Sequence, residues 1–179
     1  ASKKEEKMIA YLKTFGAKHN LETKVDEAGN VLIKKPATPG KENLQTVVLQ
    51  SHIDMVCEKN NDTDHDFLTD PIETEIDGEW MKAKGTTLGA DNGIGVATEL
   101  AILADDSIEH GPIECLFTVD EETGLTGAFA LKEGFMSGEI LLNLDSEDEG
   151  ELYIGCAGGI DTVAEFQYEN EMTPISHLC

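Results

Sequence analysis

The stretch Thr46-Val-Val-Leu-Gln-Ser-His52-Ile-Asp54 decides both the fold and the candidate site of this chain. It is a short apolar run that ends in a histidine and an aspartate, which is typical of a buried strand followed by polar residues. Two later stretches have the same form, Ile113-Glu-Cys-Leu-Phe-Thr-Val-Asp120-Glu121-Glu122 and Ile140-Leu-Leu-Asn-Leu-Asp145. In an open α/β sheet, ligands bind outside the carboxyl ends of the strands. The sequence therefore predicts that one imidazole and several carboxylates meet at one edge of a sheet.

Hydrophobic periodicity over the rest of the chain predicts an α/β fold, in which helices alternate with apolar strands. Ser2-Lys-Lys-Glu5 has the pattern of a capping box, and an amphipathic helix is expected behind it to about His19. Residues 94–104 are apolar almost all round, which predicts a buried helix. The other expected elements are strands over residues 22–26, 31–34, 46–50, 113–119, 140–144, 151–155 and 162–168, a hairpin over residues 72–82 and a short helix over residues 126–132.

The composition excludes several classes of partner. The 179 residues include 36 acidic and 13 basic side chains, for a formal charge of -23, so neither nucleic acid nor an anionic membrane surface is expected as a partner. None of the four cysteines forms a Cys-x-x-Cys pair, which argues against a thiolate zinc finger or a thioredoxin-like site. The sequence has no signal-peptide pattern and no apolar run long enough to cross a bilayer, so we expect a cytoplasmic protein.

His52 and Asp54 form the first candidate pair. Residues i and i+2 of an extended chain share one face, so His52 is a candidate metal ligand whose imidazole Asp54 would orient. Taken alone, a loop histidine beside a surface aspartate explains the His-x-Asp pattern better. Imidazole and carboxylate ligands together suit Zn²⁺, Co²⁺ or Mn²⁺.

The other candidates are carboxylates, and each has two interpretations. Asp91, in Gly89-Ala-Asp91-Asn-Gly93, is either the cap of a helix or a carboxylate that bridges two metal ions. The acids after the 113–119 strand are either a solvated turn or a general base, Glu121, beside a metal ligand, Glu122. Asp145 occupies the end of the third strand.

Four motifs in this order resemble the M20 metallopeptidase family. They are Ser51-His52-Ile-Asp54-Met-Val56, Gly89-Ala-Asp91-Asn-Gly93, Asp120-Glu121-Glu122-Thr-Gly124-Leu-Thr-Gly127-Ala128 and Leu144-Asp145-Ser-Glu147. The flanks, among them Lys35-Pro-Ala-Thr-Pro-Gly40 and Ile154-Gly-Cys-Ala-Gly-Gly159, look like the aminoacyl-histidine dipeptidase branch (peptidase D, carnosinase-like). The resemblance covers the chain to about Phe166.

The resemblance implies a fold and a set of roles. The fold would be a three-layer, zinc-exopeptidase-like domain with a central mixed sheet. His52, Asp91 and Asp145 match the ligands of one metal ion, and Asp91 with Glu122 matches those of a second. Glu121 matches the general base, and Asp54 matches the acid that orients His52. The implied reaction is hydrolysis of dipeptides, including Xaa-His dipeptides, by a water that two zinc ions activate.

Family members are considerably longer than this chain, so residues 1–179 are interpreted as the N-terminal portion of the catalytic domain. The lid or dimerisation domain, the C-terminal part of the catalytic domain and a last histidine ligand would lie outside it. The full-length protein is expected to be a homodimer, and this portion to be inactive alone. His177 is the only obvious substitute for the missing ligand, and nothing in the match supports it.

Two other functions remain open at this point. An M20-like amidohydrolase that removes acyl groups from amino acids would share all four motifs, although the flanks argue against it. A non-catalytic acidic domain that binds one metal ion is the second alternative.

Overall fold

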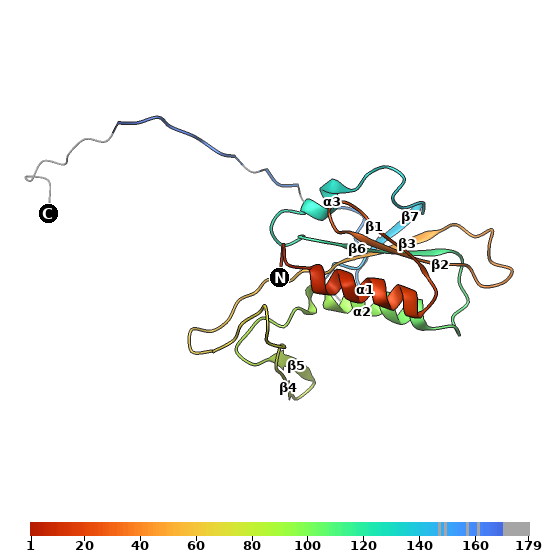
Figure 1. The fold of residues 1–179 in the computed structure, drawn as a ribbon, viewed down its shortest axis with the longest axis horizontal. Helices are drawn as coiled ribbons and strands as arrows, with labels where there is room; N and C mark the ends of the chain where they lie inside the picture. Colours follow the sequence, from red (N-terminus) through yellow and green to blue (C-terminus); the bar gives the residue numbers. More distant parts are fainter. Residues whose placement is uncertain (147, 149, 157, 161, 170–179) are drawn as a thin grey trace, which may run out of the picture. The chain divides into compact units, whose positions relative to one another are not determined.

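The computed structural model describes residues 1–146, 148, 150–156, 158–160 and 162–169, and the chain divides into two units, residues 1–147 and 148–179. All helices and strands of the described residues lie in the first unit (Figure 1). They are α1 (Glu6–Lys18), β1 (Glu22–Val25), β2 (Val31–Lys35), β3 (Val47–His52), β4 (Thr74–Asp77), β5 (Trp80–Ala83), α2 (Ala90–Ala104), β6 (Ile113–Thr118), α3 (Thr126–Ala130) and β7 (Ile140–Asn143).

A five-stranded mixed sheet in the order β1-β2-β6-β3-β7 forms the centre of the first unit. β1, β2 and β6 are antiparallel neighbours, whereas β3 is parallel to both β6 and β7. The carboxyl ends of β6, β3 and β7 therefore lie at one edge of the sheet, as the sequence predicts. The strand order could not be predicted from the sequence, because β6 lies between β2 and β3 although it begins 61 residues after the end of β3 (113 − 52) and 78 after the end of β2 (113 − 35).

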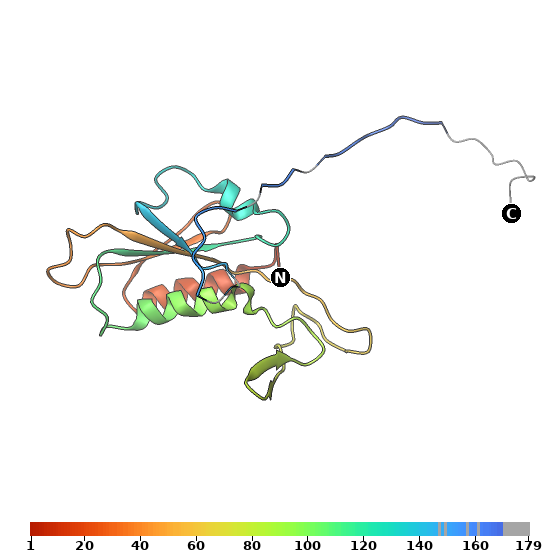
Figure 2. The same cartoon turned by 180° about the vertical axis from the view of Figure 1, so that it is seen from behind.

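The two long helices lie side by side on one face of the sheet (Figures 1 and 2). Their buried side chains, Leu12 from α1 with Val96 and Leu103 from α2, pack against strand residues that include Ile33 and Phe117. The opposite face buries a smaller cluster, Leu32, Val48 and Leu116, under Leu131, Phe135 and Met136. Apolar side chains on both faces explain why β2, β3 and β6 read as continuous hydrophobic runs rather than alternating ones.

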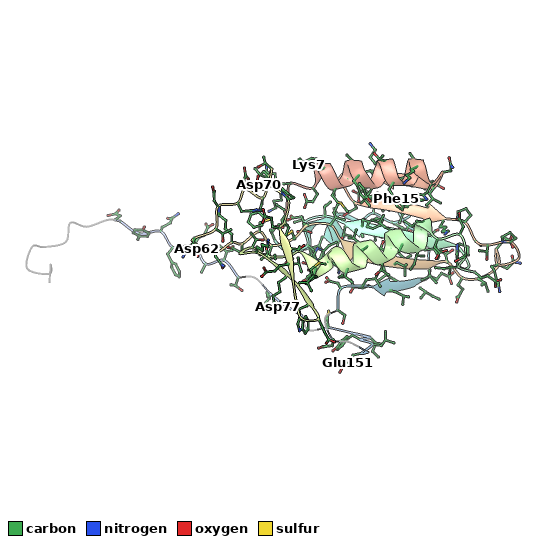
Figure 3. All side chains as sticks on the ribbon, turned by 90° about the horizontal axis from the view of Figure 1, so that it is seen from below. Lys7, Phe15, Asp62, Asp70, Asp77 and Glu151 are labelled. Carbon is green, nitrogen blue, oxygen red and sulfur yellow. The ribbon has the colours of Figure 1, made fainter. Side chains whose placement is uncertain are left out.

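The expected α/β fold with a central mixed sheet is confirmed, and so are most of its elements. The β4–β5 hairpin forms where predicted, as a separate two-stranded sheet. The side chain of Lys7 on α1 donates from Nζ to the carbonyl of Leu68, 2.7 Å away, in the loop that leads to Asp70 (Figure 3). No helix within the described ranges is long and apolar enough to cross a membrane.

Three local expectations are wrong. Ser2 does not cap α1: the N-cap is Glu5, it forms no side-chain capping bond, and Ser2 instead contacts Asp54. α2 is buried on one face only, because Ile94 and Thr98 lie on its exposed side. The strands expected over 151–155 and 162–168 are absent from the described residues of those segments. Most side chains there are exposed, and none of the described strands pairs with these segments.

Candidate metal centre

The carboxyl edge of β6, β3 and β7 gathers the predicted site residues. His52 is the last residue of β3, Asp145 lies two residues beyond β7, and Glu121 and Glu122 follow β6. Asp91 comes from the start of α2, which packs against β3. Side chains up to 93 residues apart in the sequence (145 − 52) therefore meet, because three parallel strands end together and α2 packs against β3.

His52 lies at the centre of this group and is buried. Its Nε2 atom is 2.9 Å from Asp91 Oδ1 and 3.8 Å from Asp145 Oδ1, and its Nδ1 atom is 3.3 Å from Asp54 Oδ1. Burial alone would lower the pKa of His52, but the hydrogen bonds to Asp54 and Asp91, together with the charge of Asp145, raise it to about 9. The ring is thus held where positive charge is strongly favoured, which is the environment a metal cation needs.

Asp54 is a buried carboxylate that accepts hydrogen bonds from several parts of the chain. Oδ1 accepts from the Glu121 amide at 3.0 Å and faces His52 Nδ1, while Oδ2 accepts from the Glu122 amide at 3.2 Å and the Ser2 hydroxyl at 2.7 Å. Burial opposes its ionisation, but these bonds hold the pKa of Asp54 well below its usual range. A fixed, ionised Asp54 orients the imidazole so that Nε2 faces the carboxylates.

The acidic run after β6 divides into two parts. Asp120 has a left-handed backbone, and its carboxylate accepts hydrogen bonds from the hydroxyls of Thr123 and Thr126. Glu121 and Glu122 point into the site. Burial, with the nearby charges of Asp145, Glu122 and Asp54, raises the pKa of Glu121 despite the opposing effect of His52. A carboxyl whose pKa is raised is suited to accept and return a proton near neutral pH.

Asp91 is not a helix cap. Gly89 is the N-cap of α2, no side chain caps this helix, and the backbone at Asp91 and Asn92 is non-helical, with a cis peptide bond between them. The Asp91 carboxylate instead faces His52. Glycine suits the start of α2 for two reasons. The φ of Gly89 is 77°, which residues with a side chain rarely adopt, and an added Cβ would lie 2.7 Å from Met55 Sδ.

The donor set fits a transition metal. Ligand atoms of His52, Glu121 and Asp145 lie within 4.8 Å of one another, and so do those of His52, Asp91 and Glu122. One imidazole nitrogen among carboxylate oxygens is a typical ligand set for Zn²⁺, Co²⁺ or Mn²⁺. These two sets of residues differ from the two ligand sets that the M20 resemblance implies for the two metal ions. The assignment of ligands to each ion therefore stays a prediction. His177 and Glu147 lie outside the described residues.

Two hollows adjoin the carboxylates. A cleft of about 400 Å³ is lined by Asp91, Asn92, Ile94 and Asp145. A smaller pocket, of about 70 Å³, lies between Glu121, Leu125, Ala128 and Asp145. The larger one is of the order of size of pockets that hold small ligands.

Sequence patterns did not predict a role in the core or at the site for four polar residues of the first unit, each of which is buried or contacts the site: Ser2, Glu5, Asn30 and Glu99. Asn30 donates from Nδ2 to the Gly127 carbonyl at 2.8 Å and accepts from the Val119 amide at 3.1 Å, which fastens the β1–β2 turn to the end of β6. Its only sequence signal is its place in Gly29-Asn30, a turn pair between the strands expected over residues 22–26 and 31–34. Ser2 and Glu5 were noticed, but as a local cap.

A family model and several known proteins match this chain. The model for peptidase family M20/M25/M40 matches residues 48–170. The cytosol non-specific dipeptidase of Escherichia coli is 53% identical over 170 residues, which are 95% of this chain and 35% of that protein. The crystal structure of an aminoacylhistidine dipeptidase from Vibrio alginolyticus superposes with a TM-score of 0.85 at 61% identity, over 87% of this chain and 32% of the other.

A more distant structure, the aminopeptidase PepT of Bacillus cereus, matches with a TM-score of 0.69 at 28% identity, over 83% of this chain and 40% of the other. The chain thus spans roughly a third of the length of the dipeptidases that it matches. Sequence, fold and the geometry of the strand ends lead to the same conclusion: the chain belongs to peptidase family M20/M25/M40.

Proposed function

We propose that this chain is the N-terminal, metal-binding portion of the catalytic domain of a dipeptidase with broad specificity that includes Xaa-His dipeptides. The observation that carries the proposal is the convergence of His52, at the end of β3, with carboxylates that follow β6 and β7 and with Asp91 from the start of α2. The carboxylates of Asp91 and Asp145 lie within 4 Å of its Nε2 atom. The matched relatives are a non-specific dipeptidase and an aminoacylhistidine dipeptidase, which supports a peptide rather than an N-acyl amino acid as the substrate.

The proposed ligands are His52, Asp91 and Asp145 for one ion and Asp91 with Glu122 for a second, and Zn²⁺ is the metal we favour for this mixed donor set. When bound, these ions would supply an activated water and would polarise the scissile carbonyl. A further histidine ligand and a dimeric assembly would belong to a longer protein.

The residues of this chain would share the remaining work. Asp54 holds Nδ1 of His52, so Nε2 stays directed at the cation site. Glu121 has a carboxylate oxygen within 4.8 Å of a His52 ring nitrogen, and its raised pKa would suit it to take a proton from the attacking water and pass it to the leaving amine. The cleft beside Asp91 and Asp145 would receive the peptide.

A chimera tests this function directly. This chain would replace the matching third of the E. coli dipeptidase, and hydrolysis of Xaa-His dipeptides and of N-acyl amino acids would be measured with and without a chelator. We expect chelator-sensitive hydrolysis of the dipeptides. A properly folded, metal-loaded chimera that cleaved only N-acyl amino acids would contradict the proposal.

A further inference from the structure

The N-terminal segment Ser2–Glu5 is joined to the proposed metal centre by side-chain contacts across the sequence. The Ser2 hydroxyl donates to Asp54 Oδ2 at 2.7 Å, a contact between residues 52 positions apart. Glu5, which is buried, accepts at Oε1 from the Asp120 amide at 3.1 Å, across 115 positions. The segment thus reaches both the residue that holds His52 and the loop that carries Glu121 and Glu122.

Hydrogen bonds within the N-terminal segment also fix its conformation. Glu5 Oε1 also accepts from the Lys3 amide at 2.9 Å, and the Lys4 amide donates to the Ala1 carbonyl at 3.0 Å. Lys3 has a left-handed backbone, with φ of 60°, which closes this turn. Ser2 is therefore presented to Asp54 by a turn that Glu5 anchors.

Asp54 is the point at which this contact acts on the site. It has two oxygens, and together they face the His52 ring and the amides of Glu121 and Glu122 in addition to Ser2. The contact from Ser2 is the shortest of the four. A hydrogen bond to a charged group is stronger than one between neutral groups, and it fixes the direction of the carboxylate. Without it, Oδ2 would keep only the Glu122 amide, at 3.2 Å.

We propose that Ser2 is a positioning residue of the metal centre, which acts through Asp54 on the orientation of His52 and of the Glu121–Glu122 backbone. This inference rests on the proposed metal function. Groups that orient a metal ligand from behind typically change metal affinity by 10- to 100-fold when they are removed. Because Ser2 acts one residue further out, we expect a loss of roughly tenfold.

The test compares Co²⁺ binding by the unsubstituted chain, Ser2→Ala, Ser2→Thr and Thr14→Ala, by calorimetry and by the visible absorption of the bound ion. Ser2→Thr keeps the hydroxyl. Thr14→Ala is the matched control, because it removes a hydroxyl of the adjacent helix α1 that bonds only to the Ala10 carbonyl and is exposed. Circular dichroism and thermal unfolding with chelator would establish the folded fraction of each variant. The metal affinity would then be calculated from the concentration of folded protein alone.

We expect weaker binding and an altered cobalt spectrum in Ser2→Ala, with both restored in Ser2→Thr and unchanged in Thr14→Ala. In the metal-free chain, the ¹⁵N shifts of the His52 ring should also move in Ser2→Ala alone, a change that a role confined to stability would not produce. Equal affinity and spectra in Ser2→Ala and the parent would overturn the role of Ser2 while leaving the metal centre intact. Absence of Co²⁺ binding by the unsubstituted chain would overturn the metal centre and this inference together.

Discussion

Glu99 is a carboxyl group in the middle of the core, and replacing it with glutamine should change how stability depends on pH. It lies on the buried face of α2 with no exposed surface, and neither of its oxygens has a hydrogen-bond partner of ordinary geometry. Burial raises the pKa of Glu99 to about 9, an effect that the nearby Ser51 hydroxyl and Cys115 thiol only partly offset. The group is therefore neutral in the folded protein near pH 7.

The sign of the effect follows from the two pKa values. In the unfolded chain the pKa of Glu99 is near its ordinary value of 4.5, so between about pH 4.5 and pH 9 the folded state holds a proton that the unfolded state has lost. The free energy of unfolding must then fall as pH rises, by about 1.4 kcal/mol per pH unit from this group. Between pH 5 and pH 8 the sum is on the order of 4 kcal/mol, a large part of the stability of a typical domain.

The assay is urea unfolding at pH 5, 6, 7 and 8 with chelator present, for the parent, Glu99→Gln and the exposed control Glu79→Gln. Because glutamine cannot ionise, Glu99→Gln should lose stability less steeply than the parent as pH rises, so the difference between the two should grow in favour of the variant. Glu79→Gln should follow the parent. Parallel curves for Glu99→Gln and the parent would refute the reasoning, since they would mean that Glu99 titrates alike in both states.

Two further predictions concern other carboxylates. In the chimera, Glu121→Gln should keep the metal content but lower the turnover number by roughly 100- to 10,000-fold, whereas Glu122→Gln should reduce the metal content measured by elemental analysis; the reverse pattern would exchange their roles. Burial opposes ionisation of Glu114, but its bonds with Lys34 Nζ at 2.5 Å and with Ser137 lower its pKa to about 2. Glu114→Gln should therefore destabilise the fold by about 2 kcal/mol at pH 7. That difference should shrink as pH falls from about 4.5 toward 2, where the parent carboxylate also becomes protonated, and a difference that stays constant in urea unfolding over this range would contradict the assignment.

The sequence allowed the strand ends to be predicted because the relevant signals are local. A run such as Val47–Gln50 is too apolar for a surface, and a carboxylate or histidine that follows it must lie at a strand end. Parallel strands then bring their ends to the same edge. Those two steps were enough to associate His52, Asp145 and the 120–122 loop without any knowledge of the strand order.

The parts that failed depend on contacts distant in sequence. Ser2-Lys-Lys-Glu5 satisfies the local capping-box pattern, but Asp54 and the Asp120 amide compete successfully for its polar groups. Glu99 lies in a segment in which most residues are apolar, and only the packing of α2 on β3 shows that its side chain faces inward. The strands expected beyond residue 150 had the right composition, but a strand is stable only when a neighbouring strand pairs with it.

A titration of Zn²⁺ into the purified chain, with His52→Ala as the comparison, tests the central claim most directly. The account predicts one tightly bound ion per chain, a second that binds weakly or not at all, and loss of the tight site in His52→Ala while the variant stays folded. The tight site requires the imidazole because it is the only nitrogen donor among the carboxylates gathered in the described part of the chain. Two equally tight ions, or tight binding that survives the loss of His52, would contradict it.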